Sequence, residues 1–448
     1  MNDTPRTLSA FDIGCIVVGG IVGVGIFFTP QRVAAAVDGP GVVVLAWSLG
    51  GVLAALGAFV FAGLSLRVPG HGGVFRYLEA AFGRGVAFVF GWANWLCIQA
   101  GAAGVVALLL VDYLQVAVEP EAPWSESGKV VGAAVLLLVF TFVNVLGLRV
   151  GKTVQNVLTT GKIAALAGLV LVAVWRHGDA GEAAAVAAEP TGRPLFGQLG
   201  AAMLPVLFAI GGWQQGSFVA GAARRQRSVA LGMLGGVAVV IVVYLAVNLA
   251  YLDLLGFDGA RSSPAIGAAA AKVALGQSGA RVLAALVVIS AAGILNTICL
   301  APPYVLYAMA ERGCFPAVFG RLHPRWGTPV AGILGQGLWA TFLLLSVHGL
   351  ASWAGSAQTI DTLGFVCDGV VFVDWLFYGL CGLALLQLRR GADGGRRGGG
   401  LLAALFALGA LAVMVGAIAA QPLPSLAGSA LVLVGVGVYR IWWRPHAV

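Results

Sequence analysis

Charged residues are scarce in this 448-residue chain: Asp, Glu, Lys and Arg make up 10% of it, whereas hydrophobic residues make up 60%. A soluble domain carries about 25% charged residues, so the composition excludes an ordinary soluble protein. The apolar runs reach the roughly 20 residues that a helix needs to cross a bilayer, and they are too long for barrel strands. The sequence therefore predicts an all-α polytopic membrane protein.

Motifs for catalysis, nucleotide binding and metal binding are also missing. The chain contains no HExxH, GxSxG or GxxxxGK[ST] pattern, and these patterns mark zinc hydrolases, serine hydrolases and phosphate-binding loops. The six cysteines lie in or near apolar spans without CxxC spacing, at Cys15, Cys97, Cys299, Cys314, Cys367 and Cys381. We therefore expect no disulfide, metal or cofactor, and we disfavour an intramembrane enzyme.

About twelve apolar spans have the length that a bilayer requires. They cover approximately residues 11–37, 41–66, 85–117, 128–147, 154–176, 197–223, 229–255, 281–310, 328–348, 364–388, 401–420 and 424–443. With the N-terminus placed in the cytoplasm, most of the 26 lysines and arginines fall in cytoplasmic loops. We expect a multi-pass protein of the cytoplasmic (inner) membrane with both termini inside and no nucleic-acid partner, because the basic residues report topology.

Glycines interrupt the first and the sixth spans at their centres. The first reads Gly19-Gly20-Ile21-Val22-Gly23-Val24-Gly25-Ile26-Phe27, and the sixth contains Gly211-Gly212. Glycine costs roughly 1 kcal/mol in a helix interior, and a broken helix in a bilayer frees backbone groups that must bind something. Two breaks at matching places predict inverted repeats with a midplane site between them. The alternative is close helix packing, since the chain has 66 glycines.

At these residues the sequence resembles the amino acid–polyamine–organocation (APC) transporters, in particular their L-type and prokaryotic amino acid permease branch. The similar motifs are spread over most of the chain. They are Gly23–Phe27 followed by Pro30, Arg67–Leu78, Gln155–Lys162, Phe208–Trp213, Tyr307–Gly313, His323–Pro329 and Phe372–Gly379.

The resemblance implies a LeuT-like five-plus-five inverted repeat with discontinuous helices 1 and 6. The whole chain, 1–448, would be a single transmembrane transporter domain. Repeat one would cover about 11–176, repeat two about 197–388, and two extra helices about 401–443. Four positions depart from the family pattern, at Val24, Gly63, Ala222 and Tyr304. The last three lie where the family sets its cytoplasmic gating pairs, so its gate electrostatics do not carry over.

An amino acid needs donors for its carboxylate and acceptors for its ammonium, and the ends of a broken helix supply both. We expect the N–H groups of Val24, Gly25 and Ile26 to face the carboxylate, and the carbonyls of Ile21 and Val22 to accept from the ammonium. Gly23 and Gly212 form the breaks themselves. In the sixth span, the ammonium site would be completed by the carbonyls of Phe208, Ala209 and Gly211. Phe208 is expected to act as an aromatic gate and Trp213 and Gln215 to shape the pocket, unless the two aromatic rings merely pack between helices.

Lys162 and Asp374 are the deepest charges. Lys162 lies about 12 Å into its helix, and an ionisable group at such depth indicates function. The resemblance implies that its ammonium occupies the sodium position of sodium-coupled relatives, bridging Gly19 and Gly20 to Ser290. Proton coupling, a fixed cation and a purely structural role stay open. Asp374 either orients its helix or moves protons.

His71 and His323 lie in basic cytoplasmic loops and are expected to be solvated. Arg32 and Asp38 flank the outer end of the first span and are expected to act as interfacial anchors.

The function predicted from the sequence is secondary active transport of amino acids, with neutral substrates favoured because acids are scarce in the spans. Proton symport, exchange and uniport stay open. The alternatives are transport of other amines or polyamines, a nutrient sensor and a channel on the same fold. The extracytoplasmic loops contain no cysteine, so we expect no disulfide-linked ancillary subunit.

Overall fold

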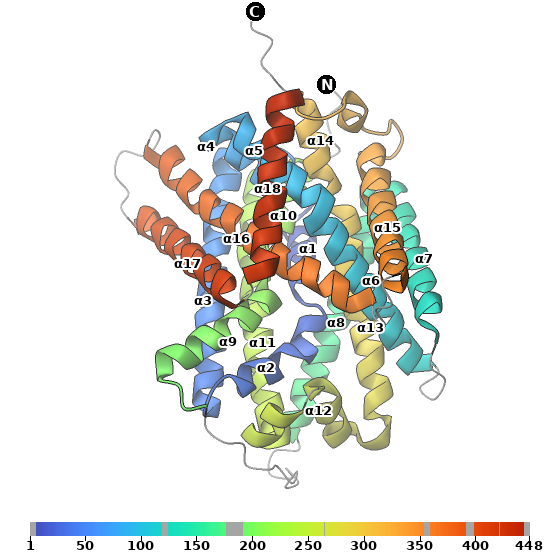
Figure 1. Ribbon diagram of the computed structural model, residues 1–448, viewed down its shortest axis with the longest axis vertical. Helices are drawn as coiled ribbons and strands as arrows, with labels where there is room; N and C mark the ends of the chain where they lie inside the picture. The colour runs from blue at the N-terminus through green and yellow to red at the C-terminus, as the bar shows by residue number, and fades with distance from the viewer. Residues whose placement is uncertain are drawn as a thin grey trace, which may run out of the picture.

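The computed structural model of the protein describes residues 6–118, 124–175, 191–263, 265–353, 359–390, 398–420 and 422–442. Over these residues the fold is a bundle of helices (Figure 1), and the non-helical pairing is one isolated parallel bridge between Leu8 and Ala223. Within these described residues, eleven helical segments are long and apolar enough to cross a membrane. The protein is therefore a multi-pass membrane protein.

Ten helices form the long elements of the bundle. They are α3 (Pro40–Arg67), α6 (Ala100–Val118), α7 (Glu126–Val145), α8 (Leu148–Trp175), α11 (Gln226–Ser262), α13 (Gly279–Leu300), α15 (Val330–Trp353), α16 (Thr359–Arg390), α17 (Gly398–Ala420) and α18 (Pro422–Trp442). The shorter α-helices are α1 (Ala10–Ile21), α2 (Thr29–Ala35), α4 (Val74–Phe82), α5 (Arg84–Ala93), α9 (Leu195–Ile210), α10 (Gln215–Phe218), α12 (Ile266–Leu275) and α14 (Pro303–Glu311). The single turns are the 3₁₀ segments η1 (Val24–Phe27), η3 (Ala220–Ala222), η4 (Gly276–Ser278) and η5 (Ala317–Gly320), and the π-helical η2 (Asn94–Gln99).

The first expected span, 11–37, is not one helix, and it is the one of the twelve expected spans that has no counterpart among the eleven segments of spanning length in the described residues. Ser9 begins α1 with a capping box, because its hydroxyl accepts from the Asp12 N–H and the Asp12 carboxylate accepts from the Ser9 N–H. The helix ends at Ile21, Val22 and Gly23 are extended, and η1 follows. The chain breaks at the glycines, as the sequence predicts.

The sixth expected span breaks in the same way after Ile210. Gly211 is extended, and Gly212 has φ of +120°, a conformation that favours glycine. A Cβ added to Gly212 would lie 2.5 Å from the carbonyl oxygen of Gly20. The two breaks therefore pack backbone against backbone, and this close approach requires glycine at position 212.

The packing partners of α1 are α8, α11 and α13, while α11 also packs along α3. In Figure 1, α4, α5 and α14 lie at the end of the bundle where α18 finishes, and α12 lies at the opposite end. The first break is thus enclosed by protein rather than by lipid, which is the setting in which a membrane helix tolerates irregular backbone.

Candidate functional site

A cavity of about 170 Å³ lies beside the two helix breaks. Its lining residues are Gly20, Ile98, Gln99, Ala102, Phe208, Gly211, Gly212, Gln214, Gln215, Ile294, Thr297, Ile298, Asp374, Trp375 and Tyr378. They come from α1, the η2–α6 segment, the α9–α10 break, α13 and α16. The cavity is small beside the roughly 300–1,000 Å³ pockets that hold drug-sized ligands.

Part of the expected substrate site lines this cavity. Phe208, Gly211, Gly212 and Gln215 do so, as do two residues expected to take part in coupling, Gly20 and Asp374. The remaining expected substrate residues are outside its lining, namely Ile21, Val22, Gly23, Val24, Gly25, Ile26, Ala209 and Trp213. All the expected substrate residues that line the cavity therefore lie at or near the second break, and none lies at the first.

Trp213, which was expected to shape the pocket, does not line the cavity. Its side chain is fully buried and packs behind the cavity, 5.8 Å from Trp375 and 5.4 Å from Tyr378 between ring centroids. It supports two aromatic wall residues and does not itself line the pocket. At the first break, the Ile294 side chain occupies the space beside Gly23.

Several lining residues were missed by the sequence analysis. Gln99, Gln214 and Thr297 are buried polar side chains within apolar spans, at 3%, 5% and 0% exposure. Polar groups buried within membrane helices usually mark functional sites. Because these three residues stand out within apolar runs, the sequence contained a signal for them. Trp375 and Tyr378 give no such signal, because an aromatic residue in an apolar span has the pattern of ordinary packing.

Lys162 lies in the middle of α8 and is 1% exposed. Its Nζ donates to the carbonyl oxygens of Val22 at 2.6 Å, Gly19 at 3.3 Å and Ser290 at 3.3 Å. An ammonium has three donors, and the three carbonyls accept all of them. Gly19 and Ser290 stand where the resemblance places them, whereas Val22 rather than Gly20 is the third acceptor.

Polar side chains of α8 also hold the first half of the broken helix. Gln155 Nε2 and Thr159 Oγ1 donate to the Cys15 carbonyl oxygen at 3.3 and 3.0 Å. Lys152 Nζ lies 3.0 Å from the Asp12 carboxylate. The position of α1 against α8 is therefore specified along its length and not by Lys162 alone.

Tyr244 of α11 joins the two breaks. Its hydroxyl oxygen lies 3.1 Å from the carbonyl oxygen of Ile21 and 3.2 Å from that of Ala209, so one proton is shared between both. These two carbonyls were expected to bind the substrate ammonium. In this structure they accept from Tyr244, which connects the end of α1 to the end of α9.

Phe208 is half-exposed at 47%, and its ring centroid lies 6.4 Å from that of Phe28. The Arg32 guanidinium lies 5.5 Å above the Phe28 ring. Asp38 accepts hydrogen bonds from Thr191 and Gln198. Phe208 is thus placed at the rim of the cavity, with Phe28 and Arg32 beside it.

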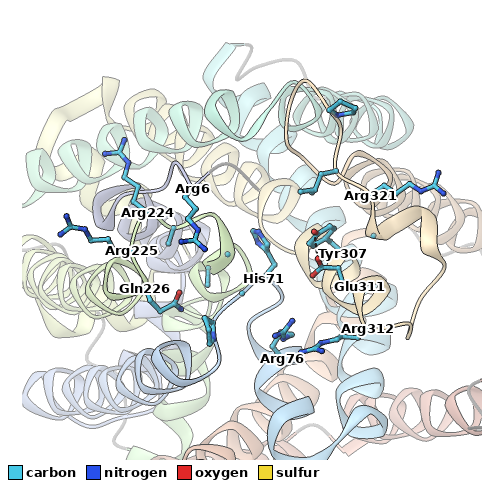
Figure 2. A pocket seen from close by; sticks show the side chains of 18 residues that line it. Arg6, His71, Arg76, Arg224, Arg225, Gln226, Tyr307, Glu311, Arg312 and Arg321 are labelled. Atoms are coloured by element: carbon cyan, nitrogen blue, oxygen red, sulfur yellow. Dashed lines mark hydrogen bonds between the residues drawn. The ribbon is translucent and has the colours of Figure 1, made fainter. Parts of the chain in front are cut away.

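A second cavity, of about 1380 Å³, opens at the end of the bundle that we call the basic end. Six arginines line it, and Glu311 is the acid among its lining residues. Figure 2 shows Arg6, Arg224 and Arg225 on one side of His71, and Arg76, Arg312 and Arg321 on the other. Its surface is strongly electropositive.

His71 was expected to be solvated, and the structure corrects this. It is 7% exposed, stacks on Tyr304 at 4.5 Å with 20° between planes, and meets the Tyr307 ring edge-on at 5.6 Å. Burial lowers the pKa of His71 to about 3. His71 and Tyr304, the latter a departure from the family pattern, thus form one aromatic stack, and the His71 ring fills the space beside Gly221.

His323 is half-buried rather than solvated. Its Nδ1 accepts from the backbone N–H groups of Arg325 and Trp326, both at 3.3 Å. Among the cysteines, Cys15, Cys299, Cys314 and Cys381 are buried free thiols and Cys97 is a half-buried one. The side chain of Cys367 lies outside the described part of the chain.

The position of Tyr244 leads to a stability prediction. Tyr244→Phe leaves two buried carbonyl oxygens without their shared donor, which costs about 1–3 kcal/mol, so we expect a Tm several degrees below wild type in detergent. Tyr251→Phe is the matched control on the same helix, because its buried hydroxyl has no partner among the described residues. Equal melting temperatures for the two variants would contradict the bridging role.

Comparisons with known proteins identify the family of the chain. The family model described as "Amino acid permease" matches residues 8–438. The chain is 28% identical to the b(0,+)-type amino acid transporter 1 of Oryctolagus cuniculus, over 87% of this chain and 78% of that protein. It is 27% identical to the Serine/threonine exchanger SteT of Bacillus subtilis (strain 168), over 85% of this chain and 83% of that protein. The Large neutral amino acids transporter small subunit 2 of Rattus norvegicus is also 27% identical, over 84% and 68%. These relatives are transporters and not enzymes, and the chain belongs to the amino acid permease family of the APC superfamily.

Proposed function

We propose that the protein carries neutral amino acids across the cytoplasmic membrane by alternating access, as a secondary transporter. The observation that carries this proposal is the cavity beside two broken helices, which the chain leaves open at the centre of an apolar bundle. Broken helices enclosing a midplane cavity are the usual arrangement of secondary transporters. The relatives, named as amino acid transporters and exchangers, support the same substrate class.

The architecture that we propose is the five-plus-five inverted repeat, with repeats at about 11–176 and 197–388 and two further helices at about 401–443. The basic end faces the cytoplasm in this proposal, because arginine-rich loops stay on that side. Both termini then lie inside. The chain acts without a disulfide-linked partner.

We propose exchange of amino acids rather than proton symport. Lys162 supplies a cation at the first break, where its side chain is 1% exposed and its Nζ donates to three carbonyl oxygens. A cation held in this way stands in for a coupling ion, and a relative of this chain, SteT, is named as an exchanger. Substrate inside the cell would then drive substrate entry.

Uptake of radiolabelled amino acids into proteoliposomes of the purified protein tests this function. Vesicles preloaded with unlabelled amino acid should accumulate label well above empty vesicles, and an inward proton gradient should add little. Uptake that follows the proton gradient in empty vesicles would contradict exchange and favour symport. Absence of uptake for all the amino acids would contradict amino acid transport altogether.

Opening of the basic end should depend on pH through His71. The neutral ring is buried in this structure with a pKa of about 3, against an ordinary value of 6.5. The charged groups that line the cavity with it are Arg76 on α4, Glu311 at the end of α14, Arg312 directly after that helix, and Arg6, Arg224, Arg225 and Arg321. The rings of Tyr304 and Tyr307 contact His71 directly. If opening hydrates the ring, the open form binds a proton that the closed form does not, so lowering the pH favours the open form.

The ratio of open to closed form should be about tenfold higher at pH 5.5, one unit below the ordinary pKa of histidine, than at pH 7.5, one unit above it. Spin labels at positions 225 and 321 on the rim of the cavity would report the opening as a longer distance in pulsed EPR. We expect the longer distance to grow in population at pH 5.5 in wild type and to stay constant in His71→Asn. An identical pH response in both proteins would contradict the role of His71.

A further inference from the structure

The polar wall of the small cavity is organised as a chain of amides. Gln99 Nε2 donates to Asn94 Oδ1 at 3.0 Å, and Gln215 Nε2 donates to Gln99 Oε1 at 3.3 Å. Each amide fixes the orientation of the next, because a nitrogen must face an oxygen at every link. The chain therefore ends on Gln215 with its amide oxygen, an acceptor, beside the cavity.

This terminal acceptor is unsatisfied. Gln215 Oε1 and the neighbouring Gln214 Oε1 are buried without a hydrogen-bond partner among the described residues, in side chains that are 6% and 5% exposed. Buried polar atoms in native proteins almost always have partners, and an orphaned acceptor at a cavity indicates a missing donor. A bound molecule that donates a hydrogen bond supplies one.

The hydroxyl groups of the wall also have no free hydrogen to donate to a ligand. The Tyr378 hydroxyl is hydrogen-bonded to the Asp374 carboxylate, and the Thr297 hydroxyl donates to the Gly293 carbonyl oxygen at 2.9 Å. Their protons are thereby engaged, while the carboxyl oxygens of Asp374 can still accept. A ligand carboxylate on this wall would face the acceptor oxygens of Gln214 and Gln215 without a hydrogen to donate to them, so the wall disfavours an acidic side chain.

The rest of the lining limits the size of the group that fits. Ile98, Ala102, Ile294, Ile298 and Trp375 surround the amides with apolar surface in a cavity of about 170 Å³. Glycines 20, 211 and 212 form the wall at the helix breaks, where the backbone of an amino acid would bind. The amide wall then faces the substrate side chain.

We propose that the cavity selects small neutral amino acids whose side chain donates a hydrogen bond, a hydroxyl or a carboxamide, and that Gln215 and Asp374 are specificity-determining residues. This inference rests on the proposed function, because it assigns the substrate class of the same site. A site built to hydrogen-bond a substrate group discriminates strongly against an analogue that lacks it, since its own polar atoms are then left unpaired.

Threonine and valine provide the test, because they have the same shape and differ by a hydroxyl against a methyl group. In preloaded proteoliposomes of wild-type protein, we expect kcat/KM for threonine to exceed that for valine by at least about tenfold. Gln215→Met should lower this ratio to within about threefold. Gln336→Met is the matched control, since Gln336 is a buried glutamine on α15 outside the cavity, and it should keep the wild-type ratio.

Thermal stabilisation of the purified protein by each amino acid separates failure of this inference from failure of the proposed function. Valine lacks the hydroxyl, and lysine is large and charged. If wild-type protein exchanges amino acids but kcat/KM for valine or for lysine equals that for threonine, the inference is overturned and the transport function stands. An unchanged threonine-to-valine ratio in Gln215→Met would also overturn the role of Gln215. If nothing is exchanged but threonine raises the Tm more than valine, the selectivity holds and the transport function fails. Equal or absent stabilisation without exchange would overturn both.

Discussion

The site depends on one interaction, the contact of the Lys162 ammonium with the carbonyl oxygens of Val22, Gly19 and Ser290. A broken helix inside a bilayer leaves carbonyl groups that neither lipid nor the helix itself satisfies. A cation in their midst satisfies them and joins α1, α8 and α13 at one point. The break at Gly23 is stable in this setting because the ammonium replaces the hydrogen bonds that a continuous helix would have formed.

The second break is held to the first without any charge. Gly212 packs against the backbone of Gly20, and Tyr244 donates to a carbonyl oxygen on each side of the junction. The cavity beside this junction is lined by polar groups from η2, the start of α10, α13 and α16. The two breaks and the cavity therefore form one connected unit.

The sequence predicted the membrane class, both breaks and the depth of Lys162, because glycine runs and a lone charge are conspicuous in apolar spans. It did not predict which face of a helix meets the cavity, so Trp213 was placed in the pocket although it packs behind it. His71 was expected to be solvated because it lies in a basic loop, and its burial depends on Tyr304, more than 200 residues further along the chain. Contacts of this kind are set by tertiary packing, on which a single sequence carries no local signal.

The central claim is that the Lys162 ammonium holds the first break in a transport-competent form. The most direct test is the initial rate of amino acid exchange by Lys162→Ala in proteoliposomes, alongside Lys272→Ala, which removes an exposed lysine of α12. Both variants are first checked for monodispersity and equal reconstitution. The account predicts that Lys162→Ala falls to the background of protein-free vesicles while Lys272→Ala keeps the wild-type rate. Exchange by Lys162→Ala at a rate near wild type would contradict it.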